Sequence, residues 1–373
     1  MTRVVLASFD RLPSAKGAAR HIGQNLAILS GAGLAVSLVT LGQEPLAGVR
    51  HLPIALSEPN FLRRALEFHS RVGRVFEQNE FDVYHVRSPW EGLAVPFGKT
   101  IVYEVNGLFS VEAAYHHPAL FGQPSVREKL RRHELALFDR AAVVITPSGV
   151  TKTHLAELGV SDDQIEVVPN APVVPIAEDL PASTDGAASI AYLGTLASWQ
   201  GLGEGLRALA RVGAPFLLTI RTPSPERPRR ELMKLASKLG IAERVRFEEP
   251  LEPEALGAWL ATQQVLLSPF VPCERNLVQG GMPLKLLDAM AAGLPVVAPD
   301  MPMVTAVLGH DHPTYRRHST ADLAALIEHL ITSARARREI GARSLARIRA
   351  RFSPEHQRAA LLAVYRRIAA SSS

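Results

Sequence analysis

Apolar and polar positions alternate along the chain in blocks of two kinds. Short apolar runs, typical of parallel strands buried on both faces, are separated by stretches in which apolar residues recur every three or four positions, as in amphipathic helices. In the first half, the runs predict strands at 4–9, 35–42, 81–87, 100–108 and 165–171, and 142–160 predicts a strand followed by a helix. Further helices are predicted through 24–29, 62–78 and 125–139.

The second half repeats this pattern. Strands are predicted at 189–196, 216–221, 244–250, 265–270 and 295–299, and helices at 201–211, 228–239, 253–262, 283–292 and 320–332. A last helix begins at Ser353, with Pro354 at its first position. The segment 171–186 is rich in proline and acidic residues and shows no periodicity, which is typical of a linker. The pattern therefore predicts two similar α/β domains, each a doubly wound parallel sheet covered by helices on both faces.

The stretch 280–300 predicts a loop, a helix, a turn and a buried strand. Two polar residues, Lys285 and Asp288, interrupt the apolar stripe of this helix and lie three positions apart. A helix N-terminus after a glycine-rich loop offers N–H groups to an anion; Lys285 adds a positive charge for a phosphate, and Asp288 adds an acceptor for hydroxyls. The same spacing also fits a solvated lysine and an aspartate that complements the helix dipole.

This stretch, together with VITPS at 144–148 and VVPN at 167–170, resembles the GT4-like retaining glycosyltransferases of the GT-B fold, glycosyltransferase group 1. The resemblance implies two Rossmann-like domains that face an interdomain cleft, and places Asp288 where the family binds the nucleotide ribose. The sequence departs from the family pattern in that Gly280 stands at the first acidic position and Asp288 replaces a glutamate.

We expect an N-terminal acceptor domain at 1–170, a linker at 171–188 and a C-terminal donor domain at 189–352. The resemblance implies that the C-terminal helix, 353–373, crosses back onto the N-terminal domain. The alternative is a helix that packs on its own domain.

Candidate donor contacts come from glycine-containing loops and nearby cations. Gly17 precedes the first helix, where a small residue lets a phosphate approach the backbone, although a plain turn explains it equally well. In the loop 194–201 the resembling family carries a basic pair, whereas this chain has Gln200 and Gly201. Lys285 is then expected to be the main phosphate cation. The remaining expected donor contacts are Gly194, Thr195, Arg221, Arg275, Pro283, Leu284 and Asp288.

The ends of two strands in the first half carry further candidates. Arg87, Trp90 and Glu91 follow one strand and are expected to contact the acceptor, or simply to cap their loop. Asn106 occupies the position at which the family often has a histidine next to the reacting sugar. Asparagine can donate and accept hydrogen bonds but is not a base, so Glu104 is the nearest titratable substitute. The expected catalytic set is Lys285, Asn106 and Glu104.

Composition and charge limit the partners. The formal charge is +5 and the isoelectric point about 9.5, which suits phosphorylated ligands or an anionic membrane surface but is too weak to indicate nucleic acid. The helices 62–78 and 125–139 are basic and are expected to be solvated, or to touch a membrane. One cysteine, Cys273, and no apolar run of membrane-spanning length predict a cytoplasmic location, with contact to the inner membrane face left open.

No cysteine–histidine cluster has metal-ligand spacing, so no metal and no cofactor are expected. The resemblance implies a metal-independent, retaining glycosyltransferase that moves a sugar from a nucleotide diphosphate sugar, UDP being the favoured carrier. The acceptor would be a glycan, a lipid-linked glycan or a small metabolite. Two alternatives stay open: a sugar-nucleotide epimerase of the same fold, and a degenerate subunit that binds nucleotide sugars without catalysis.

Overall fold

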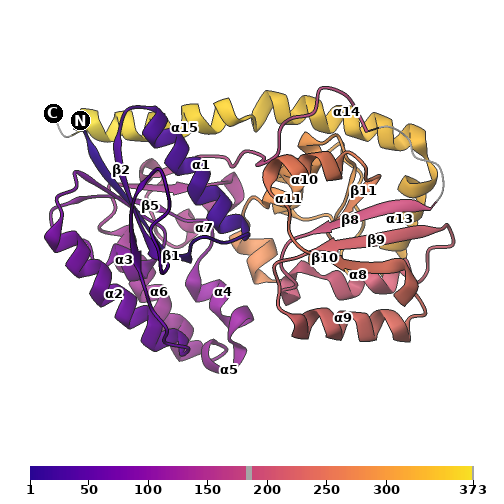
Figure 1. The fold of residues 1–373 in the computed structure, drawn as a ribbon, viewed down its shortest axis with the longest axis horizontal. Coiled ribbons are helices and arrows are strands. Elements are labelled where there is room, and N and C mark those ends of the chain that lie inside the picture. The colour runs from indigo at the N-terminus through magenta and orange to yellow at the C-terminus, as the bar shows by residue number, and fades with distance from the viewer. Residues whose placement is uncertain (182–186, 372–373) are drawn as a thin grey trace. The chain divides into compact units, whose positions relative to one another are not determined.

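The computed structural model describes residues 1–181 and 187–371, so part of the expected linker and the last two residues lie outside the described residues. The chain divides into two compact units. Unit 1 consists of residues 1–169 together with 357–373, and unit 2 consists of residues 170–356. Figure 1 shows the fold.

Unit 1 is built on a sheet of seven parallel strands in the order β3-β2-β1-β4-β5-β6-β7. The strands are β1 (Arg3–Arg11), β2 (Ala35–Leu41), β3 (Arg50–Ile54), β4 (Val83–Val86), β5 (Thr100–Glu104), β6 (Val143–Thr146) and β7 (Ile165–Val167). The edge strand β3 was not predicted, because its short run contains a proline and two basic residues among only two aliphatic ones. It is held by pairing with β2, from Ser37 with Arg50 to Leu41 with Ile54.

The two faces of this sheet bury alternate residues of β1. Val5 and Ala7 lie in one core cluster with apolar residues of α2, α3 and α6. Val4 and Leu6 point to the other face, toward α1 and α15. In Figure 1 the strands accordingly lie between α1 and α2. The helices are α1 (Gly17–Gly31), α2 (Phe61–Gln78), α3 (Pro89–Gly92), α4 (Phe109–His116), α5 (Pro118–Phe121), α6 (Pro124–Phe138), α7 (Gly149–Glu157) and α15 (Pro354–Ser371).

Helix α15 supplies part of the core of unit 1. Its residues Leu361, Val364, Tyr365 and Ile368 are buried among apolar side chains of β1, β4, β5 and β6. On its outer side, Arg367 forms an ion pair with Glu166, at 2.6 Å. The first unit is therefore discontinuous in sequence.

Unit 2 contains a sheet of five parallel strands in the order β10-β9-β8-β11-β12. Its strands are β8 (Ala188–Leu193), β9 (Phe216–Arg221), β10 (Val245–Glu248), β11 (Val265–Leu267) and β12 (Val296–Val297). One face packs against α10 (Pro253–Leu260), α11 (Leu284–Ala291) and α12 (Pro302–Leu308), and the other against α8 (Leu202–Leu209), α9 (Glu226–Lys238) and α13 (Thr320–Thr332). Figure 1 shows α10 and α11 on one side of β8 and β9, and α8 and α9 on the other.

The long periodic elements agree with the sequence prediction, including the basic helix α2. Helix α7 begins after Ser148, whose hydroxyl accepts from the Thr151 N–H. The short helices α3, α4, α5 and α12 were not predicted, since four to eight residues carry too little periodicity to separate them from loops. Helix α14 (Ala334–Arg351) precedes α15. In the described part of the chain, no helix combines the length and the apolar character needed to cross a bilayer.

Candidate functional site

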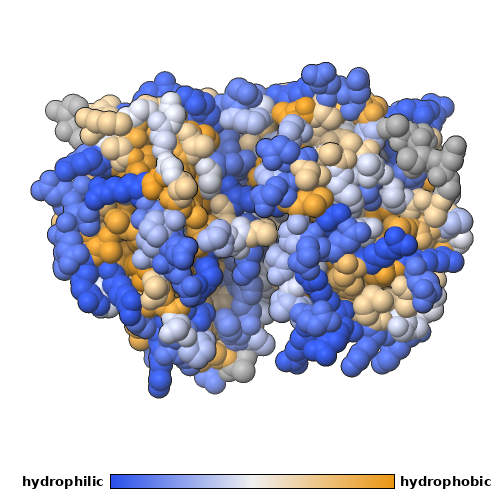
Figure 2. Space-filling model, in the orientation of Figure 1, coloured by the Kyte–Doolittle hydropathy of each residue, from blue (hydrophilic) through white to orange (hydrophobic). Residues whose placement is uncertain are grey.

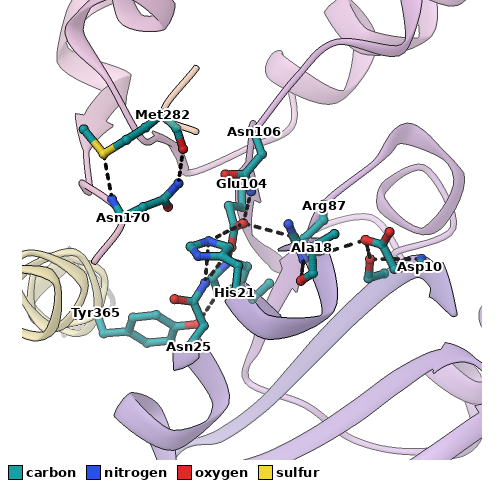
Figure 3. A network of polar contacts seen from close by, with 12 residues as sticks. Asp10, Ala18, His21, Asn25, Arg87, Glu104, Asn106, Asn170, Met282 and Tyr365 are labelled. Carbon is teal, nitrogen blue, oxygen red and sulfur yellow. Dashed lines mark hydrogen bonds and ion pairs between the residues drawn. The ribbon is translucent and has the colours of Figure 1, made fainter. Parts of the chain in front are cut away.

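The carboxyl end of the central strand β5 carries a buried carboxylate. Glu104 is 3% exposed, and four side chains donate hydrogen bonds to its two oxygens while Arg87 forms an ion pair with it (Figure 3). Oε1 accepts from His21 Nε2 at 3.0 Å and from the amide of Asn106, and it lies 3.0 Å from Arg87 Nε in the ion pair. Oε2 accepts from Asn25 Nδ2 at 2.8 Å and from His85 Nε2 at 3.0 Å.

The charge of Glu104 depends on these donors. Burial by itself would raise the pKa of the carboxyl group, but the Arg87 guanidinium and the hydrogen bonds from His21 and His85 hold it well below its usual range. Glu104 is therefore an ionised acceptor rather than a proton donor. In the structure Glu104 holds together the groups that surround it, and its expected catalytic role stays a prediction.

One of these donors leads to the C-terminal helix. His85, on β4, is fully buried, and its Nδ1 lies 2.9 Å from the hydroxyl of Tyr365 on α15. Because the ionised Glu104 can only accept, His85 Nε2 carries the proton, Nδ1 accepts, and the Tyr365 hydroxyl donates. Burial raises the pKa of Tyr365, so its hydroxyl stays protonated.

Arg87 joins the Glu104 cluster to the start of α1. Its Nη1 donates to the carbonyl of Ala18, at 3.3 Å, and lies 3.7 Å from a carboxylate oxygen of Asp10. Gly17 is the first residue of α1 rather than part of a longer loop, and no side chain caps this N-terminus. The structure therefore places the predicted Gly17, Arg87, Glu104 and Asn106 around one end of the first sheet.

Two residues expected at the acceptor have other surroundings. Glu91 is fully buried, and its carboxylate accepts from the Arg87 N–H, at 2.9 Å, and from the Ser88 hydroxyl, at 2.5 Å. Burial raises the pKa of Glu91 to about 7. Trp90 is 8% exposed and packs against Phe61. Both side chains shape the loop after β4, and contact with an acceptor stays a prediction that this burial does not support.

In unit 2, Lys285 lies in the first turn of α11, and its ammonium group lies close to two aromatic rings. Its Nζ is 4.6 Å from the centre of the Tyr192 ring and 5.3 Å from that of Phe270, and it donates to Gln200 Oε1 at 2.6 Å. Burial and the positive charge of Arg275 lower the pKa of Lys285 to about 7, although the residue as a whole is only half-buried. In the described part of the chain, Lys285 has no carboxylate partner in an ion pair.

The loop after β8 is shaped to admit this lysine. Gly194 has a φ of +111°, and a Cβ there would meet Lys285 Cε and Nζ at 3.4 Å. The carbonyl of Thr195 accepts from the Tyr192 hydroxyl, at 2.7 Å. Gly201 also has positive φ and packs so closely on Pro269 that a Cβ would overlap its carbonyl oxygen. Gln200, at the position of the family's cation, is thereby held against Lys285.

The two arginines expected among the donor contacts, Arg221 and Arg275, differ in position. Arg221 lies over the Trp259 ring, forms an ion pair with Glu248 and donates to the Glu249 carbonyl at 2.8 Å, so its side chain is directed toward β10. Arg275 is close enough to Lys285 to lower the lysine's pKa. The structure therefore brings Arg275, but not the side chain of Arg221, into the surroundings of Lys285.

The remaining predicted donor residues lie at the start of α11. Pro283 is the residue before the helix, and Leu284 is its first residue, partly buried against the core. Asp288 is 4% exposed, and its Oδ1 accepts from the Val173 N–H at 2.8 Å. Asp288 thus ties the start of the connecting segment to α11, and its contact with a ribose stays a prediction.

Sequence reasoning missed several members of both clusters. His21 and Asn25 are four residues apart on α1, which places them on one helix face, but a lone histidine and asparagine gave no signal by themselves. Tyr365 joins the Glu104 cluster from 280 residues beyond His85, and only the fold brings such positions together. Tyr192 and Phe270 appeared only as apolar residues of predicted strands.

Comparisons with known proteins were made for the whole chain. Residues 15–171 match the sequence profile of "Glycosyltransferase Family 4", and residues 187–333 match that of "Glycosyl transferases group 1". The chain is 30% identical over 169 residues to an MMP alpha-(1->4)-mannosyltransferase of Mycolicibacterium hassiacum, which covers 44% of this chain and 39% of that protein. It is 38% identical over 91 residues to a D-inositol 3-phosphate glycosyltransferase of Streptomyces scabiei, covering 23% of this chain and 20% of that one. The chain therefore spans less than half the length of these relatives.

Solved structures resemble the chain over almost its full length. The sucrose-phosphate synthase of Thermosynechococcus elongatus superposes with a TM-score of 0.81, at 18% identity and 100% coverage of both chains. HepE of Anabaena, solved in complex with UDP and glucose, superposes with a TM-score of 0.74, at 14% identity, covering 98% of this chain and 99% of that one.

We predict that Lys285 makes stability depend on pH. Its folded pKa of about 7 lies below the roughly 10.4 of an unfolded lysine, so between these values the unfolded chain binds more protons and the free energy of unfolding rises with pH. Lys285→Met should flatten this rise in urea denaturation curves recorded between pH 6.5 and 9.5. Lys234→Met, at an exposed lysine of unit 2, is the control and should leave it unchanged. Equal slopes in wild type and Lys285→Met would contradict the assignment.

Proposed function

Since the chain belongs to the glycosyltransferase family 4, or group 1, family, we propose that it moves a sugar from a nucleotide diphosphate sugar to a hydroxyl-bearing acceptor, with retention of anomeric configuration. Its two parallel-sheet units have the GT-B fold. UDP is the proposed carrier, in line with the UDP in the HepE structure. The proposed acceptor is a glycan, a lipid-linked glycan or a small metabolite.

The observation that carries the proposal is the cation at the N-terminus of α11. When the sugar's anomeric carbon separates from its phosphate oxygen, the electron pair of that bond leaves with the diphosphate. A positive charge and N–H groups aimed at the leaving oxygen lower the barrier. Lys285 lies at such a helix start, and in the described structure no carboxylate neutralises it.

The low pKa of Lys285 fits this role. Near neutral pH the free lysine is only partly protonated, because burial against two aromatic rings and the charge of Arg275 disfavour its charged form, and among the described residues no carboxylate forms an ion pair with it. A bound diphosphate supplies the missing negative charge and raises the pKa. The ammonium group is thus fully charged only when the donor is present. We propose that Gly194, Thr195 and Arg275 border the same phosphate site, and that Asp288 contacts the ribose.

In unit 1 we propose that the groups around Glu104 serve the reacting sugar and the acceptor. Asn106 and Arg87 lie nearest to the strand ends, where ligands of open α/β sheets bind. Glu104 accepts from four donors and forms an ion pair with Arg87, so its proposed part is to position these groups rather than to transfer a proton.

The proposal is tested first by the donor and then by Lys285. Among UDP-, GDP- and ADP-sugars, a UDP-sugar should raise the melting temperature, because it binds the native state only. With that donor, Lys285→Ala should lower turnover about a hundredfold, as loss of a transition-state charge contact does, while uridine affinity changes little. Gln200→Lys, which restores a cation at the usual position, should be tolerated. Near wild-type turnover of Lys285→Ala would place the cation elsewhere.

The same assays distinguish a transferase from the two alternative functions, a sugar-nucleotide epimerase and a non-catalytic binding subunit. A transferase releases UDP in step with acceptor consumption, and the anomeric proton of the product keeps the donor's configuration in NMR spectra. An epimerase would convert the donor without an acceptor. A binding subunit would bind the UDP-sugar without hydrolysis or transfer.

We further propose that the reaction needs no metal ion, because Lys285 and the start of α11 supply the positive charge at the phosphate. Among the described residues, no group of three or more histidine, cysteine, aspartate or glutamate side chains could hold a metal ion. Turnover should therefore persist in excess EDTA. Complete loss on chelation that Mg²⁺ or Mn²⁺ restores would refute the proposal.

Peripheral membrane contact through unit 1 is also proposed. On α2, Arg63, Arg71 and Arg74 are exposed, and between them Leu66 is 66% exposed, which is the composition of an interfacial helix. Figure 2 shows hydrophilic residues along the edge on the left, where Figure 1 draws α2. An anionic surface attracts each such arginine by about 1 kcal/mol.

This contact predicts binding to phosphatidylglycerol vesicles but not to phosphatidylcholine vesicles, measured by co-sedimentation at low salt. Charge reversal in Arg63→Glu/Arg74→Glu should abolish binding. Arg335→Glu, at an arginine of unit 2 whose side chain is 85% exposed, is the control and should bind like wild type. Equal binding of all three proteins would exclude the α2 surface.

A further inference from the structure

We propose that Asn106 presents its amide oxygen, as a hydrogen-bond acceptor, to a hydroxyl of the transferred sugar, and that His85 and Tyr365 are positioning residues that hold this orientation through Glu104. The inference rests on the proposed function for its ligand. The series of hydrogen bonds from Tyr365 through His85 and Glu104 to Asn106, called the positioning chain below, rests on the geometry of unit 1 alone.

The orientation of the Asn106 amide follows from its partner. Glu104 is ionised and can only accept hydrogen bonds, so the group of Asn106 that faces Glu104 Oε1 is the NH₂. The amide oxygen must then point away from the carboxylate. Asn106 is half-buried, whereas three other donors to Glu104, His21, Asn25 and His85, are buried.

Glu104 can impose this orientation on the Asn106 amide only if the plane of its own carboxylate group is fixed. Asn25 and His85 hold Oε2, at 2.8 and 3.0 Å, and thereby set the position of Oε1. His85 is fixed in turn by Tyr365, which donates to Nδ1 and so keeps the proton on Nε2. Hydrogen bonds therefore run from the Tyr365 hydroxyl through His85 and Glu104 to the Asn106 amide (Figure 3).

This orientation predicts a preference for substrates that carry a hydrogen-bond donor, such as a hydroxyl, at the contacted ring position. An amide oxygen accepts from a sugar hydroxyl but gains nothing from a fluorine or a hydrogen at that position. A side chain free to rotate could instead turn its NH₂ outward and tolerate such analogues. An asparagine amide can either donate or accept a hydrogen bond. The hydrogen bonds that begin at Tyr365 leave only the amide oxygen of Asn106 facing the substrate, as an acceptor. Asn106 is thereby a specificity-determining residue.

The first experiment needs no substrate. Protein labelled with ¹⁵N-histidine should show His85 as the Nε2–H tautomer, its signal assigned with His85→Gln. In Tyr365→Phe the Nδ1 resonance should shift, because its hydrogen-bond donor is gone. Tyr103→Phe removes the hydroxyl of another buried tyrosine of unit 1 and should leave the His85 resonances unchanged. A His85 spectrum that is the same in wild type and Tyr365→Phe would overturn the positioning chain.

The second experiment uses monodeoxyfluoro analogues of the UDP-sugar found in the donor screen. Wild type should discriminate against fluorine at one ring position by about tenfold in kcat/KM, as the loss of a hydrogen bond does. Asn106→Ala should lose this discrimination, and Tyr365→Phe should weaken it, with unchanged affinity for UDP. Full discrimination in Asn106→Ala at every position would overturn the assignment. If no UDP-sugar binds, the sugar contact fails with the proposed function, while the histidine spectra still decide the positioning chain.

Discussion

The ionised carboxylate of Glu104 exists inside unit 1 only because a guanidinium group and four hydrogen-bond donors surround it. Removing a carboxylate from water costs several kcal/mol, and that cost is met only when a countercharge and further hydrogen bonds replace the solvent. Arg87 supplies the charge, and His21, Asn25, His85 and Asn106 supply the bonds. These groups come from the carboxyl ends of two strands, β4 and β5, and from α1, so the carboxylate fixes the relative positions of the elements that form this end of the sheet.

Unit 2 presents the opposite situation. Lys285 is desolvated over Tyr192 and Phe270, and the charged group that lowers its pKa is another cation, Arg275. A buried carboxylate that is already satisfied is a rigid support, whereas a desolvated amine without a counterion has a favourable interaction still to make. The first arrangement suits groups that must hold a geometry, and the second suits a group that must receive a charge.

How far the sequence predicted these sites depends on how local each one is. The two parallel sheets and the helix after Pro283 follow from periodicity within short windows, and Lys285 was found because it interrupts an apolar stripe. The strand β3 was missed because pairing with β2, rather than its own composition, makes it a strand. The sequence left two roles open for Glu91, because a polar residue after a strand looks the same whether it faces a ligand or caps its own loop. The contribution of Tyr365 could not be foreseen, since only the folded chain brings it to His85.

The return of α15 into unit 1 has a consequence for the order in which the protein is made. A ribosome must add 280 residues after His85 before Tyr365 exists. Domains usually fold as units during synthesis, N-terminal first, but here the residues that cover Val4, Val83 and Val102 arrive last. Until then α1 alone covers that face of the first sheet, and most of unit 2 is synthesised in that interval. A circularly permuted chain in which α15 precedes β1 would make unit 1 continuous and let it complete its core before unit 2 begins.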